Sequence, residues 1–311
     1  MTTAPPRRMH LAAYAPGAGE RAGFASYERL ARTAERGLFD FLLVAEGEAH
    51  GPDALTVLAA LAAGTDRLGL AASTAFGEPC EPARRLATLD HLSAGRAAWH
   101  AHPPAGEHPR AAEFVTAARA LWDSWSPDGS PRPVAHRGRY FAVEGEFTVE
   151  RCPQGHPVTV LAGDSPEDRE LAASTADIVL LPHTTFDAAR ARYAEVKGRL
   201  AAHGRAHDEL KVMLRVAFVL DDNASVLDDN DDTGARGPFS GSPEAVAALL
   251  GAYVAEGAAD GFLLVAHGPG GLDDFVDRVV PLLQDRGAFR RTYTGSTLRS
   301  HLGIAAPVWK G

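Results

Sequence analysis

"FDFLLVAEGEAHGPDALTVLAALAAGTDRLGLAAS", residues 39–73, contains the pattern that decides the fold. The near-continuous apolar run 39–45 is typical of a strand that is buried on both faces, as in a parallel sheet. Residues 53–64 have the apolar spacing of a helix that ends at Gly64, and 68–73 form the next apolar run. A strand, a helix and a second strand in this order predict a right-handed parallel crossover.

The same unit recurs along the whole chain of 311 residues. Eight repeats suit a closed (β/α)8 TIM barrel, and a doubly wound open sheet is the alternative. We therefore expect one barrel domain over residues 1–311, with its chemistry at the carboxyl ends of the strands. The expected strands are 9–14, 39–45, 68–73, 96–101, 158–162, 177–181, 211–220 and 261–266, and the expected helices are 26–37, 53–64, 81–93, 109–125, 166–175, 185–203, 242–257 and 271–287.

Local signals add detail to this outline. Ser26 is expected to cap the first helix and Gly37 to end it. The irregular stretch 126–157 is rich in proline and glycine, and 138–149 within it is expected to form a small hairpin.

Composition excludes several classes of function. The net charge of −9 disfavours binding to nucleic acid or to an anionic membrane surface. The two cysteines, Cys80 and Cys152, form neither a disulfide framework nor a CxxC metal pair. No signal-peptide pattern begins the chain, and no apolar run reaches membrane-spanning length. We expect a cytoplasmic protein that acts on a small molecule.

Histidines gather at the expected carboxyl ends of the strands, where imidazole could act as an acid or base near neutral pH or bind an anionic group. His10, at the start of the first strand, is expected at the opposite end of the barrel. His100 and His102 share one strand face and could form a metal pair, but no third ligand is evident, so no metal is expected. Candidate catalytic residues are His50, His100 and His183, and candidate substrate-binding residues are His102 and His267.

Glu46 ends the buried strand 39–45 and joins the catalytic candidates. A carboxylate at a buried strand end could bind a cofactor or act as a base with a raised pKa. It could equally form an ion pair with Arg84 or Arg85.

The segment AGDSPEDRELAA, residues 162–173, combines a strand end, a glycine turn and a helix start. Backbone N–H groups at such a turn form an anion site, so Gly163, Asp164 and Ser165 are candidate phosphate-binding residues. Nearby carboxylates oppose that role. The alternative is that Asp164 caps the helix with its own carboxylate, in the place of an anion.

Several stretches resemble the bacterial luciferase-like flavin monooxygenases, in particular the nitrilotriacetate and alkanesulfonate monooxygenase branch. The resemblance extends from near Leu30 to the final helix. The stretches that carry it are LARTAERGLFDFLLVAEG, ALTVLAALAAGTDRLGLAAST, EPARRLATLDHLSAGRAAW, FVTAARALWDSW, RGRYFAVEGEFTVERCPQGHPVTVLAGDS, RELAASTADIVLL and GLDDFVDRVVPLLQDRGAF.

The resemblance implies a luciferase-like barrel that binds reduced FMN supplied by a separate flavin reductase. The flavin then reacts with oxygen and oxidises a small organic substrate, while the protein supplies orientation and a dry pocket. A homodimer formed through the second and third helices is also implied. A related deazaflavin-dependent oxidoreductase is a further alternative.

The chain departs from the family at the expected flavin site. The loops after the first, fourth and seventh strands are shortened, and of the fourth only His108 matches the family pattern. Asp164 replaces a small residue and Asp168 replaces a glycine in the phosphate turn. These departures leave open a flavin-free barrel, either catalytic through histidine and glutamate or a non-catalytic subunit. The positions implied to contact the cofactor are Glu46, Thr74, Ala75, Phe76 and Trp99, with Phe76 also near the substrate; Phe76 and Trp99 could instead pack the mouth.

Overall fold

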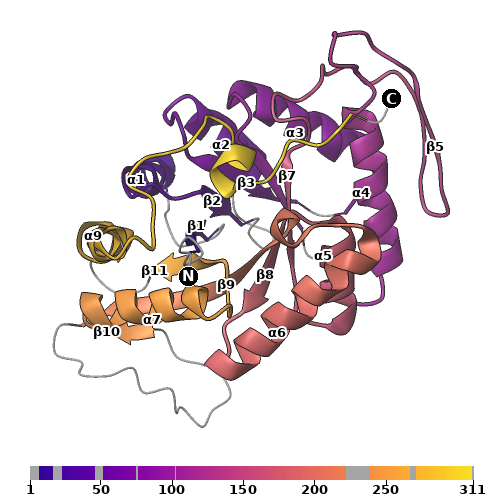
Figure 1. The fold of residues 1–311 in the computed structure, drawn as a ribbon. Coiled ribbons are helices and arrows are strands. Elements are labelled where there is room, and N and C mark those ends of the chain that lie inside the picture. Colours follow the sequence, from indigo (N-terminus) through magenta and orange to yellow (C-terminus); the bar gives the residue numbers. More distant parts are fainter. Residues whose placement is uncertain are drawn as a thin grey trace.

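The computed structural model describes residues 7–16, 23–45, 52–74, 76–101, 103–221, 239–266 and 271–309. Eight parallel strands form a closed ring in the order β11-β1-β2-β3-β4-β7-β8-β9, which the pairing of β8 with β9 completes (Figure 1). All eight predicted strands are present. They are β1 His10–Ala15, β2 Phe41–Val44, β3 Gly69–Ser73, β4 Ala97–Ala101, β7 Val158–Ala162, β8 Ile178–Pro182, β9 Lys211–Leu220 and β11 Gly261–Ala266.

Helices surround the ring of strands (Figure 1). The first helix starts earlier than predicted, because Gly23 rather than Ser26 occupies the N-cap, but it ends at Gly37 as expected. The helix predicted at 166–175 has those bounds in the structure. The helices are α1 Phe24–Arg36, α2 Ala54–Ala62, α3 Cys80–Leu92, α4 His108–Trp122, α5 Pro166–Thr175, α6 Phe186–Arg199, α7 Pro243–Ala255, and a last stretch of α8 Gly271–Asp274, the π-helical segment Phe275–Val279 and α9 Val280–Asp285.

The predicted hairpin exists, but it is displaced toward the N-terminus. Strands β5 (Val134–Arg137) and β6 (Ala142–Gly145) pair antiparallel, so residues 138–141 form the turn. The carboxylate of Glu113 on α4 explains this register, because it accepts the backbone N–H groups of residues 139–141 at 2.8–3.1 Å. A short strand that was not predicted, β10 (Phe239–Gly241), pairs parallel with the end of β9.

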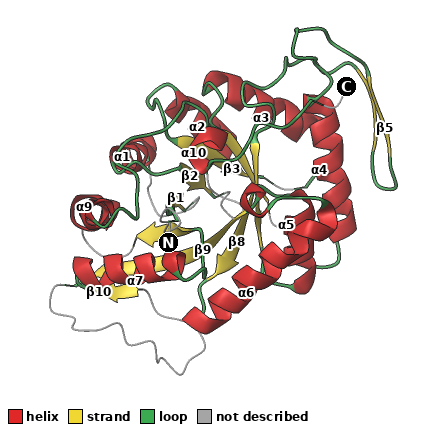
Figure 2. Cartoon of the chain, in the orientation of Figure 1, coloured by secondary structure: helices red, strands yellow, loops and turns green. Residues whose placement is uncertain are grey.

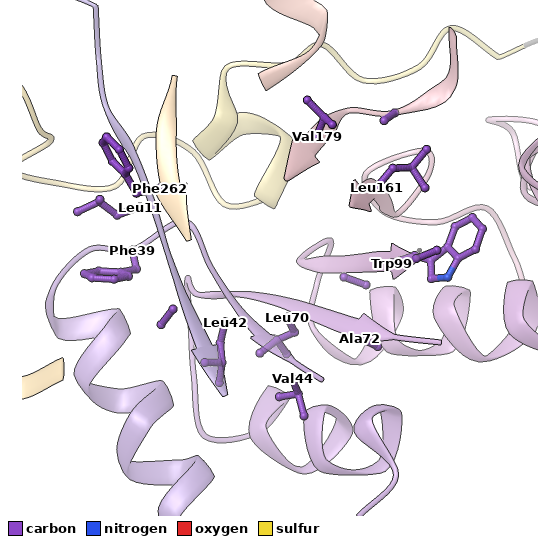
Figure 3. Close-up of a cluster of buried hydrophobic side chains, with 14 of the residues drawn as sticks. Leu11, Phe39, Leu42, Val44, Leu70, Ala72, Trp99, Leu161, Val179 and Phe262 are labelled. Atoms are coloured by element: carbon purple, nitrogen blue, oxygen red, sulfur yellow. The ribbon is translucent and has the colours of Figure 1, made fainter. Parts of the chain in front are cut away.

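Side chains alternate between the barrel interior and the helix layer, as the strand period requires. Interior positions such as Ala12, Ala98 and Met213 form one apolar cluster. The intervening positions, Trp99 and Leu161 among them, pack outward against the helices (Figure 3). This alternation decides which residues at the carboxyl ends can reach a ligand inside the barrel.

The amino end of the barrel is closed by the C-terminal segment. Helix α10 (Leu298–Leu302) lies across this end (Figure 2), and Leu298, Leu302 and Ile304 join the interior cluster. Position 69 must be glycine here, because a Cβ would lie 2.7 Å from the backbone oxygen of Asp40 as well as from the Cδ1 of Leu298. The opposite, carboxyl end therefore provides the route into the barrel.

Candidate functional site at the barrel mouth

Among the described residues, four polar side chains lie in the barrel interior at its carboxyl end. Each stands two positions beyond an interior core residue on the same strand, so the alternation directs it into the barrel. All four are partly or largely exposed. We call them the mouth residues: Tyr14 on β1, Ser73 on β3, His100 on β4 and Arg215 on β9.

Arg215 is the mouth residue that the sequence analysis missed. It lies opposite Pro182 of β8 and Leu263 of β11, and its guanidinium carbon is 4.5 Å from the centre of the Tyr14 ring. Among the residues that the structure describes, no carboxylate lies within 4 Å of it. An exposed cation without a protein anion is a binding group for an anionic ligand. The signal was a lone arginine inside the apolar run 211–220.

His100 occupies the position predicted for it. Its Nδ1 lies 3.2 Å from the hydroxyl of Ser73 on the neighbouring strand. Its carbonyl accepts the N–H of Thr74 at 3.1 Å, which ties the two strand ends together. A partly buried imidazole beside a hydroxyl can accept or donate a proton at the mouth.

His183 faces away from the mouth. It follows the outward positions Val179 and Leu181 of β8, and its ring packs edge-on against Phe239 with centroids 4.4 Å apart. Tyr253 of α7 lies at a centroid distance of 6.4 Å from His183 and also packs against Phe239. The sequence placed His183 with the catalytic histidines, but the structure places it in the aromatic layer between β8, β10 and α7.

Trp99 is fully buried in the helix layer and cannot touch a ligand in the mouth, so the prediction that it contacts the cofactor is corrected (Figure 3). Its indole N–H donates to the Thr74 hydroxyl at 2.8 Å. Phe76 packs edge-on against Trp99 and Phe114, each at 5.3 Å, and remains partly exposed. Trp99 therefore positions the end of β3, and Phe76 forms the border between the aromatic layer and the surface.

Five predicted site residues fall outside the described parts of the chain: Glu46, His50, Ala75, His102 and His267. Arg84 and Arg85, considered as partners for Glu46, pair with Glu81 and Asp53 at 2.8 and 3.0 Å. In the described ranges, no group of three histidine, cysteine or acidic side chains is arranged to hold a metal ion.

The turn at the start of α5, residues 163–168, is capped by its own side chains. Ser165 is the N-cap: its hydroxyl accepts the N–H of Asp168, and the Asp168 carboxylate accepts the N–H of Ser165, both at 3.0 Å. The prediction that Asp164 caps the helix is therefore wrong. Asp164 instead forms ion pairs with Arg169 and Arg192, both at 2.9 Å.

A second element holds the Asp168 carboxylate in place. His108, at the start of α4, lies 2.8 Å from it through Nε2. Burial opposes the charged form of Asp168, but hydrogen bonds from His108 and Ser165 outweigh burial and hold the pKa of this carboxyl below its usual value. The Asp168 carboxyl is therefore ionised near neutral pH.

The α5 turn does not fit a flavin phosphate. A Cβ built on Gly163 would lie 2.4 Å from the Asp168 carboxylate, so that carboxylate covers the glycine face that an anion would approach. Two unit charges of like sign about 4 Å apart repel by about 4 kcal/mol at an effective dielectric of about 20.

A closed parallel barrel with a polar mouth at its carboxyl end is the architecture of barrel enzymes. Residues 7–231 match the family described as luciferase-like monooxygenase, and the chain belongs to that family. It is 33% identical to nitrilotriacetate monooxygenase component A of Aminobacter aminovorans, with 90% of each chain covered. It is 30% identical to N-acetyl-S-(2-succino)cysteine monooxygenase of Bacillus subtilis, with 91% of this chain and 90% of that protein covered.

The fold also has close counterparts among solved structures. EDTA monooxygenase from Chelativorans sp. BNC1 superposes with a TM-score of 0.84 at 24% identity, over 96% of this chain and 99% of that chain. Within the described residues, no helix combines the length and apolar character needed to cross a membrane.

Proposed function

We propose that the protein is a flavin-dependent monooxygenase that oxidises a small organic acid at the barrel mouth. The observation that carries this proposal is Arg215, an exposed cation inside the barrel with no carboxylate partner among the described residues. Family membership supports the reaction class. The names of the two relatives reported above, which contain nitrilotriacetate and a succinylated cysteine, support a substrate with carboxylate groups.

The described residues would divide the work at the mouth. Arg215 would bind the acidic group of the substrate, and the ring of Tyr14 would hold the guanidinium in place by cation–π contact. His100 and Ser73 would exchange a hydrogen bond or a proton with the reacting group. Reduced flavin, when bound, supplies the reactivity toward oxygen that these side chains lack.

The partner in this proposal is a flavin reductase that delivers reduced flavin. The relative named component A belongs by its name to a system of several components, which is consistent with a separate reductase. A homodimer through α2 and α3 remains part of the proposal.

The test supplies reduced flavin from an unrelated reductase and NADH, under 18O2, to a panel of small di- and tricarboxylic acids. Their methyl esters serve as matched neutral controls. The proposal expects protein-dependent products that carry one labelled oxygen atom, formed from acids and not from esters. Labelled products from esters alone would contradict the role of Arg215, and no protein-dependent product from the panel would contradict the proposed function.

The closed α5 turn favours a second candidate, a barrel that works without flavin. Such a chain would be a non-catalytic subunit or would use His100 without a cofactor. Absence of binding to reduced flavin of any kind would favour this candidate.

A further inference from the structure

We infer that Asp168 excludes phosphate from the α5 turn, so that this chain recognises flavin without its phosphate and does not distinguish FMN from riboflavin. The inference rests on the proposed function and specifies which form of the cofactor the site accepts.

Most of the backbone hydrogen-bond donors of the α5 turn, all of which lie in the described residues, are already used. Pro166 has no N–H, and the N–H of Ser165 already donates to the Asp168 carboxylate at 3.0 Å. The N–H groups of Asp168 and Arg169 donate to the hydroxyl and the carbonyl of Ser165, both at 3.0 Å. Within the turn, the N–H groups of Asp164 and Glu167 are left for a bound anion, and both residues carry a carboxylate themselves.

The second step concerns the rigidity of the carboxylate. The side chain of Asp168 is 11% exposed and that of His108 is 14% exposed, and they join the start of α5 to the start of α4. Opening the turn to a phosphate would break this pair and both hydrogen bonds with Ser165. An incoming phosphate would have to replace three interactions that the folded chain already makes.

The third step concerns the cations that could offset the negative charge. Arg169 pairs with Asp164 at 2.9 Å and with Glu195 of α6 at 3.2 Å. Arg192 pairs with the second oxygen of Asp164, also at 2.9 Å. Both arginines thus already pair with carboxylates of the protein, so a phosphate dianion would compete with these carboxylates for them.

Together these contacts place the Asp168 carboxylate in the position where a bound phosphate would lie. In this proposal the ring system of the flavin binds at the mouth, and the phosphate of FMN remains in solvent. Riboflavin and FMN should bind equally well.

The experiment is an anaerobic titration of the full chain with reduced FMN and reduced riboflavin, followed by flavin fluorescence or absorbance. The wild type is expected to bind the two with dissociation constants within about threefold of each other. Asp168→Gly should tighten FMN at least about tenfold, equivalent to about 1.4 kcal/mol, and leave riboflavin unchanged. Asp168→Asn, which keeps the shape and removes the charge, should give a smaller gain. Glu167→Gln is the matched control, since it removes the same charge from the same turn without opening it.

Each outcome has one meaning. Tenfold or stronger preference of the wild type for FMN would overturn the inference and leave the proposed function standing. Equal binding by the wild type with no gain in Asp168→Gly would overturn the role of Asp168. If the wild type binds neither flavin, the proposed function fails. In that case, a gain of FMN binding by Asp168→Gly still supports the exclusion of phosphate by Asp168. No gain in this variant overturns that exclusion.

Discussion

The two ends of the barrel differ in how their charged residues are paired. At the amino end, an aspartate precedes three of the strands, is buried or largely buried, and accepts the N–H of a neighbouring strand at 2.8–2.9 Å. Each also pairs with a buried cation: Asp40 with Arg290, Asp177 with Arg299 and Asp260 with Lys197. At the carboxyl end, Arg215 is exposed and pairs with none of the described carboxylates.

This difference separates groups that stabilise the fold from groups that serve a ligand. A buried charge that lacks a partner destabilises a protein strongly, so the amino end must satisfy every charge within the chain. An exposed charge costs little when it is unpaired. The mouth can therefore keep Arg215 available, and each prediction below tests one side of this contrast.

The largest effect is expected at Asp40. Asp40→Ala would leave Arg290, whose side chain is 1% exposed, without its carboxylate, and His10 would lose its partner at 3.2 Å. We expect the free energy of unfolding to fall by about 3–5 kcal/mol, measured by urea denaturation. Glu28→Ala is the control, because it breaks an exposed ion pair with Arg32 and should cost less than about 1 kcal/mol. Equal losses in both variants would contradict the contrast between buried and exposed charge.

Asp90 tests the amino end by pH. This buried carboxylate accepts hydrogen bonds from the neutral groups of Gln154 and Ala97, and burial outweighs them and raises its pKa to about 6. The folded state therefore holds the proton more tightly than the unfolded state, whose pKa is about 3.9. Stability should fall by about 2 kcal/mol as the pH rises from about 4 to about 6. The measured quantity is the difference between wild type and Asp90→Asn in urea denaturation across this range; a difference that does not change with pH would refute the raised pKa.

Arg215→Met tests the mouth. Loss of a charged hydrogen bond of about 1.5–3 kcal/mol should weaken binding of an acidic ligand about 10- to 100-fold. The unfolding free energy should change by less than about 1 kcal/mol, because no ion pair is broken. Arg190→Met on α6 removes the same charge from an exposed weak pair at 3.9 Å and should leave ligand binding intact. Large destabilisation with unchanged ligand affinity would mean that Arg215 is structural.

Ser165→Ala gives the smallest expected effect. It removes the N-cap of α5 and should cost about 1 kcal/mol in thermal unfolding. Ser242→Ala, which removes the N-cap of α7, is the matched control and should cost a similar amount. Because Ser165 already serves Asp168, FMN and riboflavin affinities should change together. A selective loss of FMN affinity would show that Ser165 binds phosphate.

Much of the fold could be predicted from sequence, because apolar runs and helical spacing report burial directly. All eight strands and the bounds of α5 followed from these patterns. The direction of single side chains at the strand ends could not be predicted from these patterns. His183 lies one position beyond the end of β8, where the alternation of side chains no longer fixes their direction. Trp99 was predicted to contact the cofactor from the family resemblance, although the alternation along β4 directs its side chain toward the helices.

Prediction of the site was also limited, because long-range contacts cannot be found from the spacing of residues in the sequence. The carboxylate of Asp168 turns back to its own N-cap because His108, 60 residues earlier in the chain, holds its other oxygen. Arg215 could have been found, since period two places it on the same face as Met213 of the interior cluster. A charged residue on the interior face of a barrel strand indicates a ligand site when it lies toward the carboxyl end.

The most direct test of the account is hydrogen–deuterium exchange of the full chain, with and without saturating reduced riboflavin or FMN under anaerobic conditions. We expect both flavins to protect the peptides that contain Tyr14, Ser73, His100 or Arg215. Peptides that contain Asp40, Asp177 or the α5 turn at 163–168 should exchange at the same rate whether FMN or riboflavin is bound. Protection of the α5 turn by FMN alone, or no protection at the mouth by either flavin, would contradict the account.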